Sequence, residues 1–363
     1  MSWYAIAAVD RAFSRTKKAL FEPFDFWKWV KLAIIIFLIG GGGSNFGGQG
    51  TGYQGGPEDF ENNVPYVGPG NDPAHLPGEI LNQIPYFTNT SAADLALLTG
   101  LIAGFILLVL IFIYISSIME FVFVESLVKN EVKFWNYSRR FLGKGFYLFL
   151  VRLVLSLVFL ILFAIFLLPL ILMIFGESTD FTWPVIFGSF FWFIGIIALL
   201  VLTTAVNSFI SLGIPLSIYK NTGILSAFGL VFSNFRKSWR EIIVYWLVRF
   251  VLGLAVGIAA ILLFVILILI LGLLFLIIDG ILYFIFSSLL SESLSWVPLV
   301  PIIIIEFILF LGALLFFGVP FQVFMKYHLL SFLEAWFTNS EIPFFDASNS
   351  KSENSLSVPE NNI

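Results

Sequence analysis

The sequence predicts an all-α integral membrane protein with six transmembrane helices, and two observations carry this prediction. Of the 363 residues 59% are hydrophobic and 12% are charged. The charged fraction is about half of that in a soluble globular domain. The apolar residues also gather in long segments almost free of charge, each long enough for the roughly 20 residues that cross a bilayer.

Five spans are clear, and the first is weaker. The clear spans are the charge-poor segments 95–119, 153–175, 181–219, 250–278 and 297–325. The first has the short apolar run 32–39, and it reaches spanning length only if 24–31 joins it, with Lys28 and Lys31 reaching back to the interface. A cleaved signal peptide is the alternative for this segment, but its acids and its place in the repeat described below favour a span.

Basic residues orient the spans. All 19 Lys and Arg lie in segments that a six-span arrangement places on one side, whereas the connections on the other side carry only acids. The positive-inside rule therefore predicts a cell-membrane protein with both termini in the cytoplasm.

Two segments outside the spans are polar. The outer connection 40–91 is rich in Gly, Pro and Asn and holds a glycosylation sequon at Asn89. The polar tail 338–363 is expected to be disordered. Residues 281–290 are expected to lie flat on the outer face or to re-enter the membrane.

An internal repeat divides the six spans into three hairpins. LVRLVLSL (150–157) returns as LVRFVLGL (247–254), and WVKLAIII (29–36) has the same form. The span exits GIPLSIYK (213–220) and GVPFQVFMK (318–326) also match. We expect repeat units of about 1–121, 122–216 and 217–322 within one membrane domain, 1–337.

Each unit also contains a candidate amphipathic helix on the cytoplasmic side. In 1–20, Trp3, Ile6 and Phe13 share one side, and Arg11 and Lys18 share the opposite side. Segments 123–142, 222–239 and 326–337 are further candidates. Such helices suit the headgroup boundary, where they recognise anionic lipid or anchor the neighbouring spans. Membrane lipids with anionic headgroups and other membrane proteins are therefore the expected partners.

Glu306 is the only ionisable residue expected deep in a span. It lies roughly 13 Å inside the last span at ~1.5 Å per residue. An isolated carboxylate is costly there, which favours either a proton or cation site or a protonated glutamate that is hydrogen-bonded to a neighbouring helix. Asn207 belongs to a polar stripe in the fourth span and is a second intramembrane candidate, with interhelical hydrogen bonding as its structural alternative.

Three basic residues share one position of the repeat. Lys31, Arg152 and Arg249 stand near the cytoplasmic ends of their spans. They either bind lipid phosphates or pair with carboxylates at the same level, for which Glu120 and Glu125 are the candidates.

Several classes of site are excluded. The chain has no cysteine and two distant histidines, so we expect no metal centre and no thiol chemistry. GTGYQG (50–55) has the glycine spacing of a dinucleotide site but lacks the flanking strand and helix that such a site needs. No catalytic motif was found, and the basic segments lie beside the membrane. We therefore expect no enzyme activity, cofactor, nucleotide or nucleic acid.

The opening SWYAIAAVDRAFSRTKKALFEPFDFWKWVKLAIIIFLIGGGG resembles a family of uncharacterised multi-pass membrane proteins of methanogenic archaea. More distantly, the six-span plan with aromatic segments before the spans is similar to the membrane domain of some glycerophosphodiester phosphodiesterases. The resemblance implies an archaeal cell membrane and brings no catalytic residues, since the soluble catalytic domain of those enzymes has no counterpart here.

The expected function is that of a non-enzymatic scaffold that binds lipid or partner proteins. The first alternative is a transporter or channel with Glu306 in its pathway. The second alternative is a lipid-modifying enzyme.

Overall fold

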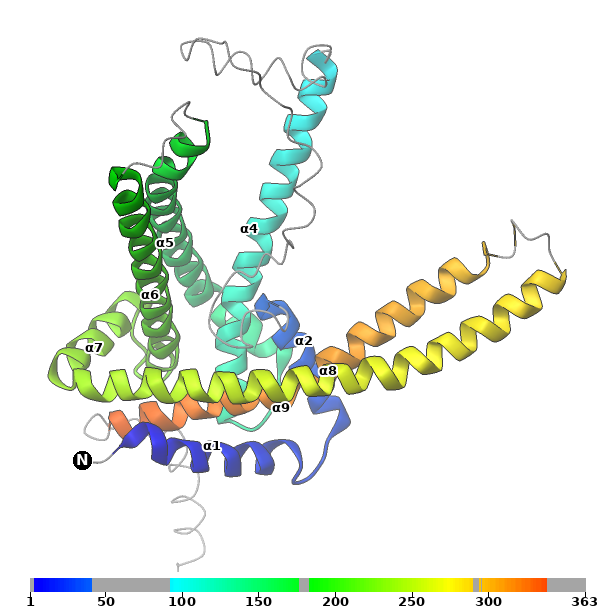
Figure 1. Cartoon of the computed structure of the whole chain (residues 1–363). Coiled ribbons are helices and arrows are strands. Elements are labelled where there is room, and N and C mark those ends of the chain that lie inside the picture. Colours follow the sequence, from blue (N-terminus) through cyan, green and yellow to red (C-terminus); the bar gives the residue numbers. More distant parts are fainter. Residues whose placement is uncertain (1–2, 41–91, 176–182, 290–293, 295, 338–363) are drawn as a thin grey trace, which may run out of the picture. The chain divides into compact units, whose positions relative to one another are not determined.

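The computed structural model describes residues 3–40, 92–175, 183–289, 294 and 296–337, and the regular structure in these ranges is helical (Figure 1). The long outer connection with Asn89 and the polar tail, both named above, lie outside these ranges. The described helices are α1 (Tyr4–Leu20), α2 (Phe26–Gly40), α4 (Ala92–Val128), α5 (Phe134–Phe175), α6 (Trp183–Tyr219), α7 (Ile224–Lys237), α8 (Trp239–Leu289) and α9 (Leu299–Trp336).

Five of these helices are long and apolar enough to cross a membrane, namely α4, α5, α6, α8 and α9. The chain is therefore an all-helical, multi-pass membrane protein, as its composition predicts. Helix α2 has 15 residues, fewer than the roughly 20 that a span needs. The sixth span and the three-hairpin repeat stay predictions.

The chain divides into two compact units. The larger consists of Met1–Gly50 with Ile115–Ile363, and the smaller of Thr51–Tyr114. In the smaller unit the structure describes the first part of α4, whose large apolar side chains are exposed. All contacts described below belong to the larger unit.

Several expected segments are continuous with longer helices. Residues 134–142 begin α5 and 326–336 end α9, so neither forms a separate interfacial helix. Residues 281–289 continue α8, so they are part of one long helix and not a separate element after the span. The physical reason is that Gly280 is the only helix-weakening residue at this point, and one glycine costs a helix only about 1 kcal/mol.

The most buried element is the C-terminal part of α9, from Gln322 to Trp336. Helix α1 packs along it, with Figure 1 showing α8 beside the pair. The face of α1 that is buried there is a stripe of small side chains, formed by Ala5, Ala8, Ala12, Thr16 and Ala19. Small side chains let two helix backbones approach closely.

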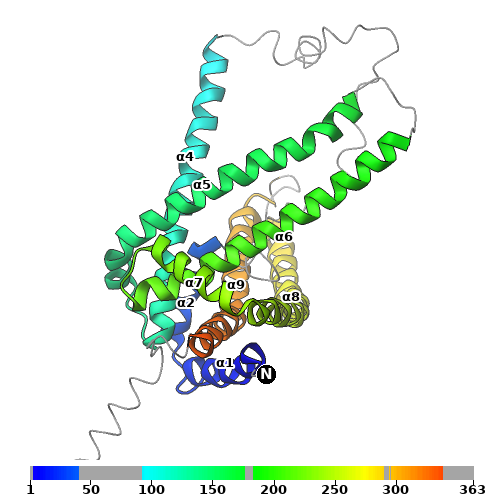
Figure 2. The same ribbon diagram turned by 90° about the vertical axis from the view of Figure 1, so that its left-hand side faces the viewer.

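Helix α7 covers part of α6, as Figure 2 shows from a second direction. It buries Ile224, Ala227 and Val231 on one face. Between α6 and α7, two residues after the end of α6, Asn221 has a φ of 51°, and Asn130 stands in the same place after α4 with a φ of 55°. Asparagine tolerates this left-handed conformation better than most residues, and in both places it follows a lysine.

Candidate functional site: a polar core at the helix ends

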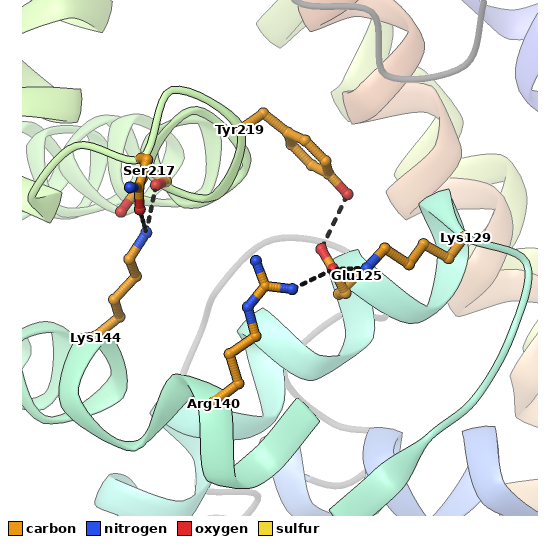
Figure 3. A network of polar contacts seen from close by, with 7 residues as sticks. Glu125, Lys129, Arg140, Lys144, Ser217 and Tyr219 are labelled. Carbon is orange, nitrogen blue, oxygen red and sulfur yellow. Dashed lines mark hydrogen bonds and ion pairs between the residues drawn. The ribbon is translucent and has the colours of Figure 1, made fainter. Parts of the chain in front are cut away.

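Glu125 in α4 is the hub of a network that joins three helices (Figure 3). Its side chain is 2% exposed and lies 2.5 Å from Lys129 Nζ and 3.2 Å from Arg140 Nη1 of α5. Its other oxygen accepts a hydrogen bond from the hydroxyl of Tyr219 at the end of α6, at 3.1 Å. A buried carboxylate is tolerated only when it is paired, and here all its partners come from helix ends.

Two lysines bind the ends of returning helices. Lys144 Nζ donates to the carbonyl of Ser217 at 2.7 Å and to Asn221 Oδ1 at 3.5 Å, and this contact also appears in Figure 3. Lys28 Nζ donates in the same way to Asn130 Oδ1, at 2.6 Å. A positive charge is favourable at a helix C-terminus, where the carbonyl groups lack partners.

A second charged cluster lies one turn and a half before Glu125 on the same helix. Glu120 forms an ion pair of 2.7 Å with Arg152 of α5. Lys326 of α9 lies within electrostatic range of this pair and of Arg249 in α8. Arg249 Nη1 donates to the hydroxyl of Tyr245 at 2.7 Å. Two basic groups, Arg152 and Lys326, thus act on Glu120, and Arg249 joins the cluster through its proximity to Lys326.

Buried aromatic side chains continue this cluster towards α1. The ring of Tyr245 stacks on His328 and on Phe332, with centroids 5.8 and 4.2 Å apart. His328 is fully buried, and its Nε2–H donates to the carbonyl of Ala5 at 3.1 Å. Arg15 of α1 bonds Ser331 and pairs with Glu334 at 3.1 Å.

The structure separates the three repeat-position residues. Arg152 and Arg249 belong to the cluster around Glu120, whereas Lys31 is exposed in a shallow groove of about 620 Å³ beside Lys133 and Trp135. Lys133 pairs with Glu131 at 2.9 Å, and the hydrogen bond with this carboxylate raises the pKa of the lysine. The two arginines and Lys31 therefore lie in different surroundings.

Asn207 is half-buried in α6. Its neighbour Ser208 accepts a hydrogen bond of 3.0 Å from Trp246 Nε1 and so connects α6 to α8. Thr203 and Thr204 bond to carbonyl groups of their own helix. In the described part of this polar stripe, Ser208 makes the contact to another helix.

Glu306 faces Asp279 across the α8–α9 hairpin. Glu306 is 8% exposed, and its carboxyl group lies within electrostatic range of Asp279. Two neighbouring carboxyl groups disfavour each other's ionised form. Asp279 was expected in an outer connection, and the continuation of α8 to Leu289 places it in a helix instead.

Sequence reasoning missed three of these features. Glu125 was considered only as a partner of the arginines, although Lys129 four residues later already signals an ion pair on one helix face. The alanine stripe of α1 is hard to recognise in the sequence, because the aromatic and basic residues of the same helix form a stronger pattern. Asp279 was overlooked because a charge usually ends a span. Among the described residues there is no group of three or more metal-binding side chains.

Residues 3–341 match a family model described as a family of unknown function (DUF7544). The chain belongs to this family. No curated protein and no solved structure matches the chain. The expectation of an uncharacterised family is confirmed, while the archaeal origin and the likeness to the phosphodiesterase membrane domain stay proposals.

Proposed function

We propose that this member of the family is a non-enzymatic membrane scaffold that interacts with lipid headgroups and holds partner proteins in the membrane. The observation that supports this most is the position of α1. Its alanine stripe fixes it on α9, which leaves Ile6 and Phe13 exposed, with the exposed Lys17 one turn after Phe13. An apolar surface next to an ammonium group suits the boundary between acyl chains and anionic headgroups.

The polar core supports a structural role for its charges. Glu125 connects α4, α5 and α6, and Glu120 connects α4 and α5. Each of these carboxylates has its basic partner on another helix, so the pairs hold the helix ends together.

The test of the lipid interaction uses the full chain in nanodiscs. One set contains only phosphatidylcholine, and the other has half of it replaced by phosphatidylglycerol. We expect a higher melting temperature in the anionic set, because a ligand that binds the folded state stabilises it. The difference should shrink as salt rises from 50 to 500 mM, since salt screens exposed charges. Equal melting temperatures in both sets at low salt would reject the lipid interaction.

The proposal includes six spans in three hairpins, with the basic side in the cytoplasm of an archaeal cell. The matching ends of α4 and α6 support the repeat, because a Lys–Asn pair directly follows each helix and a lysine of the outgoing helix binds the asparagine. A single cysteine at Gln49 should react with an impermeant thiol reagent in intact cells, and one at Ser14 should not. The reverse pattern would reject this orientation.

Transport is the second candidate, and the carboxyl pair of Asp279 and Glu306 favours it. Two neighbouring carboxyl groups within membrane helices are suited to bind and release protons or small cations. Proteoliposomes with the wild-type chain would then carry a proton flux that Glu306→Gln abolishes. Equal flux in both, or none above empty liposomes, excludes this candidate.

A further inference from the structure

An apolar groove of about 810 Å³ runs between α5, α6 and α7, and we call it the α7 groove. Its walls include Val151 and Val154 of α5, Val206 and Phe209 of α6, and Leu225 and Phe232 of α7. Of the described residues that line it, Tyr147 alone carries a polar side-chain atom. The groove therefore fits an apolar ligand, and its volume is in the range of about 300–1,000 Å³ found for small-molecule sites.

One wall of the groove ends in a positive charge. Leu225, Gly229, Phe232 and Arg236 follow one another at spacings of four, three and four residues, so they form one stripe along α7. The first three line the groove, and the Arg236 guanidinium lies 5.9 Å from the Phe232 ring. No carboxylate of the described chain forms an ion pair with this guanidinium, which stays available to an anion.

The surroundings of Arg236 strengthen this charge. Between residues 181 and 278 the chain has five basic residues and a single acid, Glu241. Lys237 follows Arg236 directly, and Arg240 lies over the Trp239 ring at 5.6 Å. The end of the groove is therefore positive, while its walls are apolar.

We propose that the α7 groove binds one phospholipid with an anionic headgroup, whose acyl chain fills the groove and whose phosphate lies on Arg236. This inference rests on the proposed lipid interaction and gives it a site. An elongated apolar ligand with a negative end matches both observations. A helix with its side chains is about 10–12 Å across with a pitch of about 5.4 Å, so the groove would hold under two turns of a partner helix.

The first test fills the groove without straining the fold. A Cβ atom added at Gly229 meets nothing within 4 Å, and the same holds for Gly143 of α5, which does not line the groove. Leucine is also a better helix former than glycine, so neither Gly229→Leu nor the control Gly143→Leu should unfold the chain. Native mass spectrometry after incubation with equal amounts of phosphatidylglycerol and phosphatidylcholine counts the lipids that each variant retains.

We expect the wild-type chain and Gly143→Leu to retain one phosphatidylglycerol that Gly229→Leu loses.

The second test compares two neighbouring charges, of which only Arg236 lies on the groove stripe. Arg236→Gln should lower retention about fivefold, which corresponds to about 1 kcal/mol per basic residue. Lys237→Gln removes the same charge beside the stripe and should change retention less than twofold.

Three outcomes separate the groove from the general lipid interaction. If the nanodisc experiment shows stabilisation by anionic lipid but Gly229→Leu retains as much as Gly143→Leu, the groove assignment is wrong and the lipid interaction stands. If Arg236→Gln and Lys237→Gln lower retention equally, the headgroup does not lie on Arg236 and the assignment fails. If Gly229→Leu converts a dimer to a monomer, a second copy occupies the groove instead of a lipid.

Discussion

The two halves of α9 differ in composition and have opposite surroundings. In the first half, large side chains such as Ile304 and Phe307 are exposed, whereas in the second half nearly every residue from Gln322 to Trp336 is buried. The second half also carries most of the polar residues of the helix, among them Lys326 and His328. In this membrane helix, polar side chains therefore mark the part that contacts protein.

The difference follows from what surrounds each half. Exposed apolar side chains of a membrane helix meet lipid tails, which are as apolar as the side chains and contribute little to holding helices together. The second half instead packs on α1 and α8, where stacked rings and hydrogen bonds add to the contact area. We therefore expect the stability of the chain to depend on the second half far more than on the first.

The largest expected effect is that of Phe332→Ala. Phe332 is 0% exposed and stacks on Tyr245 with ring centroids 4.2 Å apart. Its removal leaves a cavity in the packed part of α9, which costs about 3–5 kcal/mol of the free energy of unfolding. Unfolding by denaturant in detergent micelles measures this loss.

Phe307→Ala is the matched control, because it makes the same change in the first half of the same helix. Phe307 is 60% exposed, so its replacement leaves no cavity inside the protein and should cost below about 1 kcal/mol. Equal losses for the two variants would contradict the division of α9 into a lipid-facing and a protein-facing half.

A smaller effect is expected at the Glu125 hub. Glu125→Gln keeps the shape of the side chain but removes the charge that Lys129 and Arg140 share. Both partners are about half exposed and can turn to water, so the cost is below that of a fully buried pair, at about 2 kcal/mol. The melting temperature in micelles should fall accordingly.

Glu131→Gln is the control for the hub. Glu131 also pairs with a lysine, but both side chains are more than half exposed. An exposed pair is screened by solvent and contributes little to stability, so this variant should melt close to the wild-type temperature. If the two glutamates prove equally important, burial is not what distinguishes the hub.

The sequence predicted the membrane class and five spans well, because both depend on long apolar segments that stand out without any knowledge of packing. It also suggested Glu120 as a partner for Arg152, since charges at the same depth tend to meet. It did not predict the alanine stripe of α1. Alanine is apolar but small, so the aromatic side chains dominate the helical pattern even though α1 packs through its smallest residues.

The polar contacts were harder to predict for a similar reason. Tyr219 reaches Glu125 across 94 positions of sequence, and Glu306 reaches Asp279 only because α8 continues beyond the expected end of its span. Such contacts depend on the register of one helix against another. Periodicity fixes the buried face of a single helix but not its height against its neighbour.

The smallest expected effect concerns the end of α9, where Trp336 Nε1 donates to Ser238 Oγ at 2.8 Å. Ser238→Ala removes this acceptor and leaves a largely buried indole N–H without its partner, which costs about 1 kcal/mol. Ser233→Ala, at an exposed position of α7, makes the same substitution without that loss. We expect the melting temperature to fall for Ser238→Ala alone. If neither variant differs from the wild type, the connection between α7 and the buried half of α9 does not depend on this hydrogen bond, and apolar packing of the Trp336 ring on Phe332 and Phe337 accounts for it.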